Sequence, residues 1–296
     1  MTMTPHQILG AARAGDMERL GIEPDAVAGA VRGFGEVGDA ASALELVALT
    51  WRMWLARGEI AEGSAVVAAA LAVPRGSVVP WEVRALYADG LFAFRAGNQP
   101  RSLLSNEKAL VVARQTGDTR GECDALTGLA RVALRDGKYK DVVALARQAR
   151  ERASTEGDHQ AGVGPLHLEA AGTRLQGDYP AARELYLESL RLNTELGNAT
   201  WVWTELHNLG WVELHLGNVE AARLRFQERD AATDPDAYGD AWKELNWSAV
   251  AAVEGDITEA RRRYAIGTTA LEQLGMALDP DDRSELDWLT GQLQTP

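Results

Sequence analysis

The stretch TELHNLGWVELHLGNVEAARLRF, from Thr204 to Phe226, decides the fold. It reads as a helix, a break at Gly217 and a second helix. Forty residues upstream, PLHLEAAGTRLQGDYPAARELY (residues 165–186) has the same form, with its break at Gly177. The same pattern at a fixed distance indicates an internal repeat, which is typical of solenoid proteins.

Two series of glycines carry the period. The first series marks the break inside each helix pair and consists of Gly58, Gly97, Gly137, Gly177, Gly217 and Gly255. Consecutive members are 39, 40, 40, 40 and 38 residues apart. The second marks the end of a pair, also every 40 residues: Gly117, Gly157 and Gly197. Glycine is favoured after a helix C-terminus, where φ is often positive.

Between the glycines the apolar residues have helical spacing. In one second helix they fall at i, i+3, i+4, i+7 and i+8: Ala182, Leu185, Tyr186, Ser189 and Leu190. A small or aliphatic residue recurs early in each second helix: Ser102, Val142, Ala182, Ala222 and Ala260. A large residue follows one turn later in three units: Tyr186, Phe226 and Tyr264. With no alternating run typical of a strand, the pattern predicts an all-α solenoid of about six helix pairs.

The motif resembles tetratricopeptide repeats (TPR), through Leu206, Gly210, Gly217 and Ala222. The resemblance implies a right-handed superhelical solenoid in which the first helix of each pair lines a concave face. The period here exceeds the usual one of about 34 residues, which implies longer helices.

A more specific resemblance lies in LTWRMWLARGEIAEGSAVVAAAL, Leu49–Leu71, which is similar to the start of the repeat arrays in actinobacterial-type regulators of the LuxR and AfsR kinds. It extends over roughly residues 40–275 and implies a bacterial protein. Those regulators also carry a nucleotide-binding module and a helix-turn-helix. This chain has no G-x-x-x-x-G-K-[ST] phosphate loop, so neither role is transferred to it.

The ends of the chain differ from the repeats. We expect residues 1–40 to form two short capping helices, divided near Gly21–Asp25. Residues 41–275 form the predicted TPR-like array, and residues 276–296 a C-terminal capping helix with Trp288 packed inward.

Composition limits the function. The 296 residues include 30 Lys plus Arg and 43 Asp plus Glu, a net charge of −13. This charge disfavours direct binding of nucleic acid and of anionic membranes, which both attract cationic surfaces. We expect a cytoplasmic protein. The sequence has a single cysteine, it does not start with a basic and apolar leader, and it has no apolar run long enough to span a membrane.

Several short motifs favour ordinary structure. GFGEVG, residues 33–38, follows a helical pattern and not a strand, so we expect a turn. The stretch at 234–245 resembles a calcium loop but has Leu245 where an acid is needed. We expect a turn there, with Asp240 as a helix N-cap. The five histidines lack metal-ligand spacing, and Cys123 has no catalytic context. No metal, cofactor or catalytic residue is predicted.

The candidate site is the concave face. Aligning the units on their glycines places fourteen residues there: Arg52, Arg84, Tyr87, Arg95, Asp124, Thr127, Arg131, Arg135, His167, Arg174, Thr204, His207, Trp211 and His215. The sixth unit, offset by a deletion, adds Trp242, Asn246 and Ala249. Arginine suits carboxylate or phosphate recognition, and tryptophan offers a flat apolar contact. The alternative is an ordinary solvated helix surface, with Trp211 in the core.

These observations predict a non-catalytic interaction module that binds a peptide, a protein segment or a small acidic ligand in its concave groove. The alternative is a small-molecule-binding protein or enzyme that uses the interior as a pocket. Its acid–base groups would be His167, His207, His215 and Asp124. A structural spacer is the third possibility. An enclosed cavity with converging polar groups would favour the pocket, and an open groove would favour the module.

Overall fold

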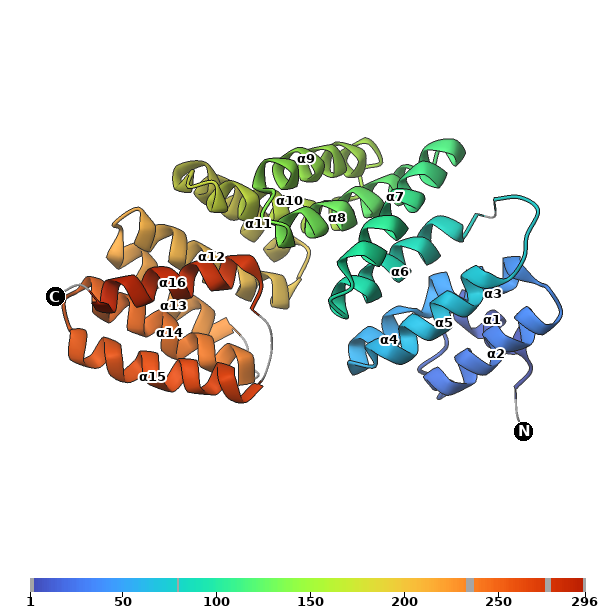
Figure 1. Cartoon of the computed structure of the whole chain (residues 1–296), viewed down its shortest axis with the longest axis horizontal. Helices are drawn as coiled ribbons and strands as arrows, with labels where there is room; N and C mark the ends of the chain where they lie inside the picture. The colour runs from blue at the N-terminus through green and yellow to red at the C-terminus, as the bar shows by residue number, and fades with distance from the viewer. Residues whose placement is uncertain (1–2, 79, 233–236, 275–277, 295–296) are drawn as a thin grey trace. The chain divides into compact units, whose positions relative to one another are not determined.

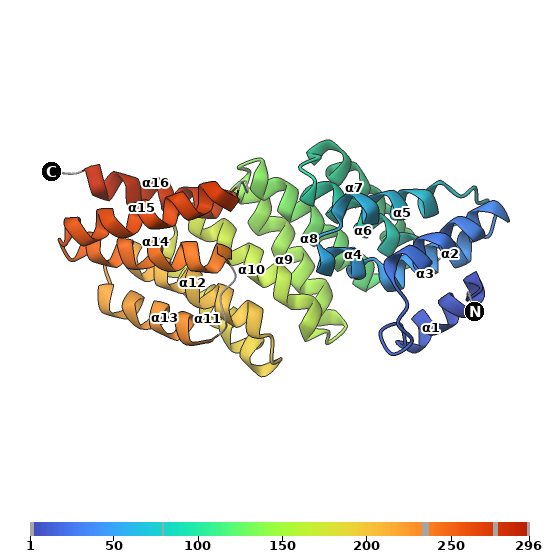
Figure 2. The same cartoon turned by 90° about the horizontal axis from the view of Figure 1, so that it is seen from below.

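The computed structural model describes residues 3–78, 80–232, 237–274 and 278–294. Its contacts group the chain into two compact units, Met1–Val132 (unit 1) and Ala133–Pro296 (unit 2). Helices are the only regular elements in the described residues, as Figures 1 and 2 show. The all-α class is therefore confirmed. The division between the units falls inside the region 41–275 that the sequence assigns to the array.

The helices follow the predicted pairs. Unit 1 contains α1 (Pro5–Ala14), α2 (Pro24–Glu36), α3 (Ala40–Thr50), α4 (Arg52–Arg57), α5 (Ile60–Ala72), α6 (Glu82–Arg95), α7 (Gln99–Thr116) and most of α8 (Thr119–Arg135). Unit 2 contains the end of α8 and then α9 (Tyr139–Thr155), α10 (His159–Leu175), α11 (Tyr179–Glu195), α12 (Ala199–His215), α13 (Val219–Ala232), α14 (Ala237–Val253), α15 (Ile257–Leu274) and α16 (Pro280–Gln294).

The turns occur at the predicted glycines. Gly177 and Gly217 have φ values of 85° and 78°, in the left-handed region that residues with a Cβ rarely adopt. After Gly217, the N–H of Asn218 bonds to the carbonyl of Glu213 at 2.8 Å and closes the helix end. The other marker glycines also have positive φ: Gly58, Gly97, Gly117, Gly137, Gly157, Gly197 and Gly255. The repeat period is confirmed.

Within a pair the helices approach closely at small residues. Ala182 and Ala222 are fully buried, and so are Tyr186 and Phe226 one turn later. A Cβ on Gly210 of α12 would lie 2.2 Å from the ring of Phe226 on α13. The small residues therefore let the helices meet, and the aromatic residues fill the space beside them.

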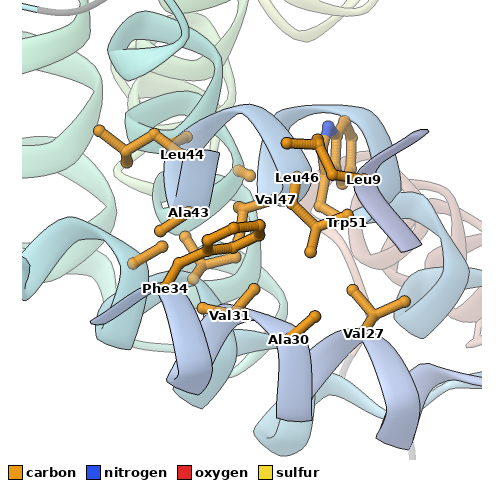
Figure 3. Packing of buried hydrophobic residues seen from close by; sticks show 14 of the residues in the cluster. Leu9, Val27, Ala30, Val31, Phe34, Ala43, Leu44, Leu46, Val47 and Trp51 are labelled. Atoms are coloured by element: carbon orange, nitrogen blue, oxygen red, sulfur yellow. The ribbon is translucent and has the colours of Figure 1, made fainter. Parts of the chain in front are cut away.

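The N-terminal helices form the core of unit 1. Figure 3 shows Phe34 of α2 among aliphatic side chains of α2 and α3, which include Val31 and Ala43. Phe34 and Ala43 are at most 1% exposed. At the break between α3 and α4, Trp51 contacts Tyr87 edge-on, with 6.0 Å between ring centroids. The segment 33–38 is the end of α2 and the turn after it, as predicted.

The C-terminal helices form an aromatic core in unit 2. Trp211 of α12 and Trp242 of α14 are at most 1% exposed and meet edge-on at 6.2 Å. The last helix, α16, adds Leu289 and Leu293 to this core. Its Trp288 packs against Trp211 at 5.9 Å, inward as predicted.

One local prediction is wrong. Asp240 was expected as an N-cap, but it lies inside the first turn of α14, which begins at Ala237. Asp234 and Asp236 of the calcium-like stretch lie outside the described residues. In the parts of the chain that the structure describes, no helix has the length and apolar character needed to cross a membrane.

Candidate functional site

Unit 1 has a cavity of about 170 Å³ where first helices of three repeat pairs come together. The residues that line it come from the α3–α4 junction, α6 and α8: Ala48, Trp51, Arg52, Arg84, Tyr87, Arg120 and Asp124. Four of them are among the predicted concave-face residues: Arg52, Arg84, Tyr87 and Asp124. We call this the unit 1 cavity.

Three guanidinium groups and one carboxylate line the unit 1 cavity. Arg120 pairs with Asp124 at 3.3 Å. Arg52 and Arg84 form no ion pair or hydrogen bond with any other residue that the structure describes. The guanidinium of Arg52 lies 4.2 Å from the centre of the Trp51 ring, a contact that uses its flat face. Its N–H groups, at the edge of the guanidinium, are left for another partner.

The charge of the unit 1 cavity is positive. Burial raises the pKa of the Asp124 carboxyl, and the neighbouring arginines offset part of that rise. Three arginines against one aspartate leave an excess of positive charge, in a chain whose net charge is −13. Such a site can accept a carboxylate or phosphate group, because the planar guanidinium matches the geometry of both.

The other predicted residues of unit 1 do not line this cavity. Arg131 donates a hydrogen bond to Tyr87 Oη at 3.0 Å and thereby joins α8 to α6. Thr127 is buried and donates to the carbonyl of Cys123 at 2.7 Å. Arg95 is exposed in the last turn of α6.

In unit 2, acidic residues of α16 pair with two of the predicted basic residues, Arg174 and His215. Arg174 of α10 lies 3.0 Å from Glu285 and 3.3 Å from Asp281. His215 Nε2 of α12 lies 2.7 Å from the same Glu285. Arg174 is only 3% exposed, so the expectation that it is a solvated groove residue is wrong.

The acidic end of α16 therefore lies on the basic surface. Arg135, at the end of α8, lies 3.4 Å from Asp279, immediately before α16. Farther along α16, Thr290 meets Tyr264 of α15 at 2.8 Å. An acidic segment of the chain itself occupies the surface that the sequence predicts to bind one.

This arrangement of helix pairs is found in known structures. Neither a protein-family model nor a curated protein matches the sequence. Among solved structures, apo RapI is similar over 92% of this chain and 98% of its own, with 12% identity and a TM-score of 0.67. The fold is that of the TPR-like helical repeats.

Two further TPR-like structures hold a ligand. NprR in complex with its cognate peptide NprX matches 97% of this chain and 81% of its own, with 16% identity and a TM-score of 0.62. A Rap protein complexed with Competence and Sporulation Factor matches 82% of this chain and 75% of its own, with 13% identity and a TM-score of 0.62. At these identities the likeness concerns the fold.

A second, partly open cavity of about 200 Å³ lies among the TPR-like pairs of unit 2. It is lined by residues of α10, α12 and α14 and of the start of α16: His167, Trp203, Thr204, His207, Asn208, Tyr238, Trp242, Asp279, Asp281 and Asp282. Three of them belong to the predicted fourteen: His167, Thr204 and His207. We call this the unit 2 cavity.

The two histidines of the unit 2 cavity differ in charge. Burial lowers the pKa of His167, but the charge of Glu205 and its hydrogen bond to Nδ1, at 3.1 Å, raise it overall above the ordinary value. Burial lowers the pKa of His207 well below the ordinary value, and nearby Arg229 and Arg174 lower it further. Near neutral pH, His167 holds a proton more readily than His207 does.

Trp211 belongs to the core. It is fully buried and donates from Nε1 to Asn246 Oδ1 at 2.8 Å. The sequence left two places open for Trp211, the groove and the core, and the structure places it in the core. Of the three residues assigned to the sixth unit, Trp242 lines the unit 2 cavity, whereas Asn246 and Ala249 are fully buried.

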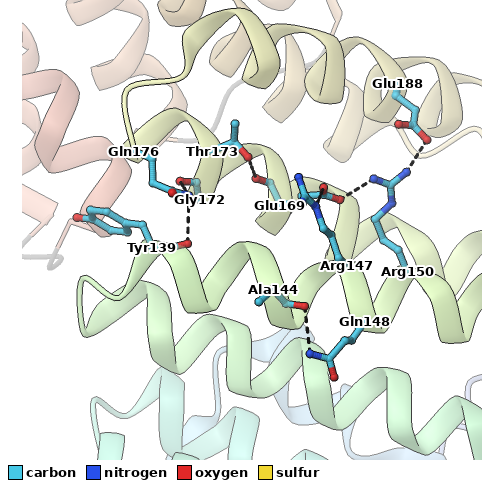
Figure 4. A network of polar contacts seen from close by, with 10 residues as sticks. All are labelled: Tyr139, Ala144, Arg147, Gln148, Arg150, Glu169, Gly172, Thr173, Gln176 and Glu188. Carbon is cyan, nitrogen blue, oxygen red and sulfur yellow. Dashed lines mark hydrogen bonds and ion pairs between the residues drawn. The ribbon is translucent and has the colours of Figure 1, made fainter.

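A third cavity, of about 740 Å³, lies along α9, α10 and α11. Figure 4 shows the charged network beside it. Arg147 and Arg150 of α9 lie 2.7 and 2.6 Å from Glu169 of α10, and Arg150 lies 2.7 Å from Glu188 of α11. These charges pair with one another across two repeats, so we interpret the network as a structural connection.

Both cavities include residues that the sequence pattern does not single out. Arg120 stands one helical turn before Asp124, a spacing that predicts contact on one helix face. Asp281 and Asp282 stand in an acidic run of the predicted capping helix, and no local signal shows which surface that helix covers. Cys123 is buried, as expected of a packed thiol. The described residues contain no group of three or more side chains placed to hold a metal ion.

Proposed function

We propose that the protein is a non-catalytic TPR-like module that binds an acidic segment of a peptide or partner protein at the unit 1 cavity. The observation that carries this proposal is the convergence of Arg52, Arg84 and Arg120 on one cavity. Two of these guanidinium groups form no ion pair with a described residue. A carboxylate that enters would meet donors already placed by their aromatic and ionic contacts.

The known structures support a peptide ligand. NprR is found with its cognate peptide, and a Rap protein with Competence and Sporulation Factor, on the same kind of repeat scaffold. Repeats of this kind supply a long surface made of successive first helices.

Unit 2 supplies a precedent for the chemistry. There an acidic helix of the chain itself, α16, neutralises Arg174 and approaches His215. Because first helices carry comparable basic residues in unit 1, we infer that an acidic segment from another molecule satisfies them in the same way.

The finer resemblance to the repeat regions of LuxR- and AfsR-type regulators stays a prediction, as do the bacterial origin and the cytoplasmic location. No DNA-binding or nucleotide-binding role is transferred from that resemblance.

The test is the affinity for a hexaglutamate peptide, with hexalysine as the probe of opposite charge, measured by isothermal titration calorimetry at low ionic strength. We expect binding of hexaglutamate only. The double variant Arg52→Glu/Arg84→Glu should weaken it by at least about tenfold, since each charge contributes about 1–3 kcal/mol.

The matched control is Arg32→Glu/Lys108→Glu, which changes the net charge equally at exposed positions on α2 and α7. It should bind like the parent. If both double variants lose the same affinity, the effect is one of net charge, and the unit 1 cavity is not the site.

A small-molecule function is the second candidate, and the unit 2 cavity favours it because polar groups converge there. Of the proposed acid–base groups, His167 and His207 line this cavity, whereas Asp124 lines the other one. His215 contacts Glu285 and lines neither of the two.

A further inference from the structure

The unit 2 cavity is lined by three carboxyl groups, those of Asp279, Asp281 and Asp282. Asp281 shares the guanidinium of Arg174 with Glu285, at 3.3 and 3.0 Å. Asp282 accepts a hydrogen bond from Tyr238 Oη, and no described cation lies within ion-pair distance of it. One carboxyl group of the lining therefore lacks a positive partner.

Aromatic rings stand beside these carboxyl groups. Trp203, Tyr238 and Trp242 line the same cavity. Trp203 already takes the guanidinium of Arg229 over its ring, at 4.0 Å from the ring centre. Indole faces attract cations, most strongly when water is excluded. A positive group in the cavity would thus gain from both the rings and the carboxylates.

The cavity lining also includes His207, whose tautomer can be assigned from its hydrogen-bond partner. Trp211 Nε1–H donates to Asn246 Oδ1 at 2.8 Å, so the other amide atom of Asn246 is the nitrogen. That nitrogen lies 3.3 Å from His207 Nδ1 and donates to it. His207 is 8% exposed, and its depressed pKa keeps it neutral, so its proton is on Nε2.

The Nε2–H of His207 has no acceptor among the residues that the structure describes. The buried Nε1–H of Trp242, a second group in the lining, forms no hydrogen bond of ordinary geometry there, although it interacts with the Tyr238 hydroxyl and lowers the pKa of that group. A donor without a good acceptor inside a cavity is costly, and it calls for a ligand or a water molecule.

We propose that the unit 2 cavity binds a small organic amine that also carries a hydrogen-bond acceptor. The ammonium group lies against Asp281 and Asp282 and the aromatic rings, and the acceptor takes the N–H of His207 or Trp242. This site goes beyond the proposed peptide-binding function, because it lies in another unit and selects the opposite charge.

The protonation of Asp282 is consistent with this site. Burial and the neighbouring charge of Asp281 raise the pKa of Asp282 to about 8. The carboxyl group therefore keeps its proton near neutral pH while no cation is beside it. An ammonium group would lower that pKa again and displace the proton.

Three probes of similar length distinguish the contact of the ammonium group from the contact of the hydrogen-bond acceptor: 4-amino-1-butanol, butylamine and 1,4-butanediol. Each is titrated into the full chain in a calorimeter at pH 8. We expect 4-amino-1-butanol to bind tightest and the diol to bind at least about tenfold more weakly, because it lacks the charge. Equal binding of the diol, or no binding of the amino alcohol, would overturn the proposal. Butylamine as tight as the amino alcohol would overturn the acceptor contact.

The variant Asp282→Asn tests the location. It keeps the shape of the side chain and removes the charge, so we expect the affinity for 4-amino-1-butanol to fall at least about tenfold. Asp287→Asn, an exposed position on the same helix, should bind like the parent. Undiminished binding by Asp282→Asn, with a parent-like melting curve, would place the amine elsewhere. Binding of hexaglutamate is unaffected in either case, so this test fails or succeeds independently of the proposed peptide function.

Discussion

Gly210 and Gly10 both lie inside helices, but their surroundings differ. A Cβ on Gly210 would lie 2.2 Å from the Phe226 ring, whereas a Cβ on Gly10 would meet nothing within 4 Å. We expect Gly210→Ala to destabilise the protein by about 1–3 kcal/mol, because the core cannot take the added methyl group without moving. Urea unfolding measures this change.

Gly10→Ala is the control, and it should be neutral or stabilising by up to about 1 kcal/mol, since alanine favours the helix. A Gly210→Ala variant as stable as the parent would show that the close approach of α12 and α13 does not depend on glycine.

Asp282 gives a prediction about pH. Its pKa is about 8 in the folded protein, raised by burial and Asp281, and about 4 in an unfolded chain. Between these values the folded state holds more protons than the unfolded state, so stability falls as pH rises from about 4 to about 8.

Asp282→Asn removes this loss, so the variant should gain stability relative to the parent as pH rises over that range. Thermal unfolding of both proteins at pH 5 and pH 8 measures the difference. The titratable neighbours on other helices, His167, Arg174 and Tyr238, are common to both proteins, so their own titration contributes to both curves. A difference independent of pH would mean that Asp282 titrates normally.

At the scale of elements, α16 is joined to two other helices of unit 2 through one carboxyl group. Glu285 is 2% exposed and lies within 3.0 Å of Arg174 on α10 and 2.7 Å of His215 on α12. Removing one partner of a buried charge pair costs about 3–5 kcal/mol, because the other charge stays buried. Glu285→Ala should therefore lower the free energy of unfolding by about this amount.

Arg283→Ala is the comparison, because Arg283 is exposed on the same helix. It should change stability by less than about 0.5 kcal/mol. Equal, small effects of both changes in urea unfolding would show that α16 is not anchored by Glu285.

Local patterns predicted the helices well, since glycine turns and apolar stripes act over a few residues. Gly177, Ala182 and Tyr186 lie in the structure as that reasoning requires. The same reasoning placed Arg52 and Arg84 on one face and the structure brings them to one cavity. It could not reveal that Arg174 is buried, because the residues that cover it lie more than a hundred positions later in the chain.

For the molecule as a whole, net charge governs one class of partner. The net charge of −13 disfavours a phosphate backbone, and two of the predicted basic residues, Arg174 and His215, are already paired with Glu285 of α16. We expect no binding of random duplex DNA at physiological salt in a mobility-shift assay. A submicromolar shift that weakens with added salt would contradict this and point to a regulator that contacts DNA.

The tryptophans have a further consequence, for spectroscopy. Three lie in the first 81 residues and six between 201 and 288, so none lies in the helices from α7 to α11. Tryptophan fluorescence, excited where tyrosine does not absorb, therefore reports on the aromatic cores of the two ends and has no fluorophore in the central helices. Stability in repeat proteins is a sum over neighbouring units, and such units can separate energetically. Unfolding curves from fluorescence and from circular dichroism would then diverge, and the gap between them would measure the loss of helix in the middle of the chain.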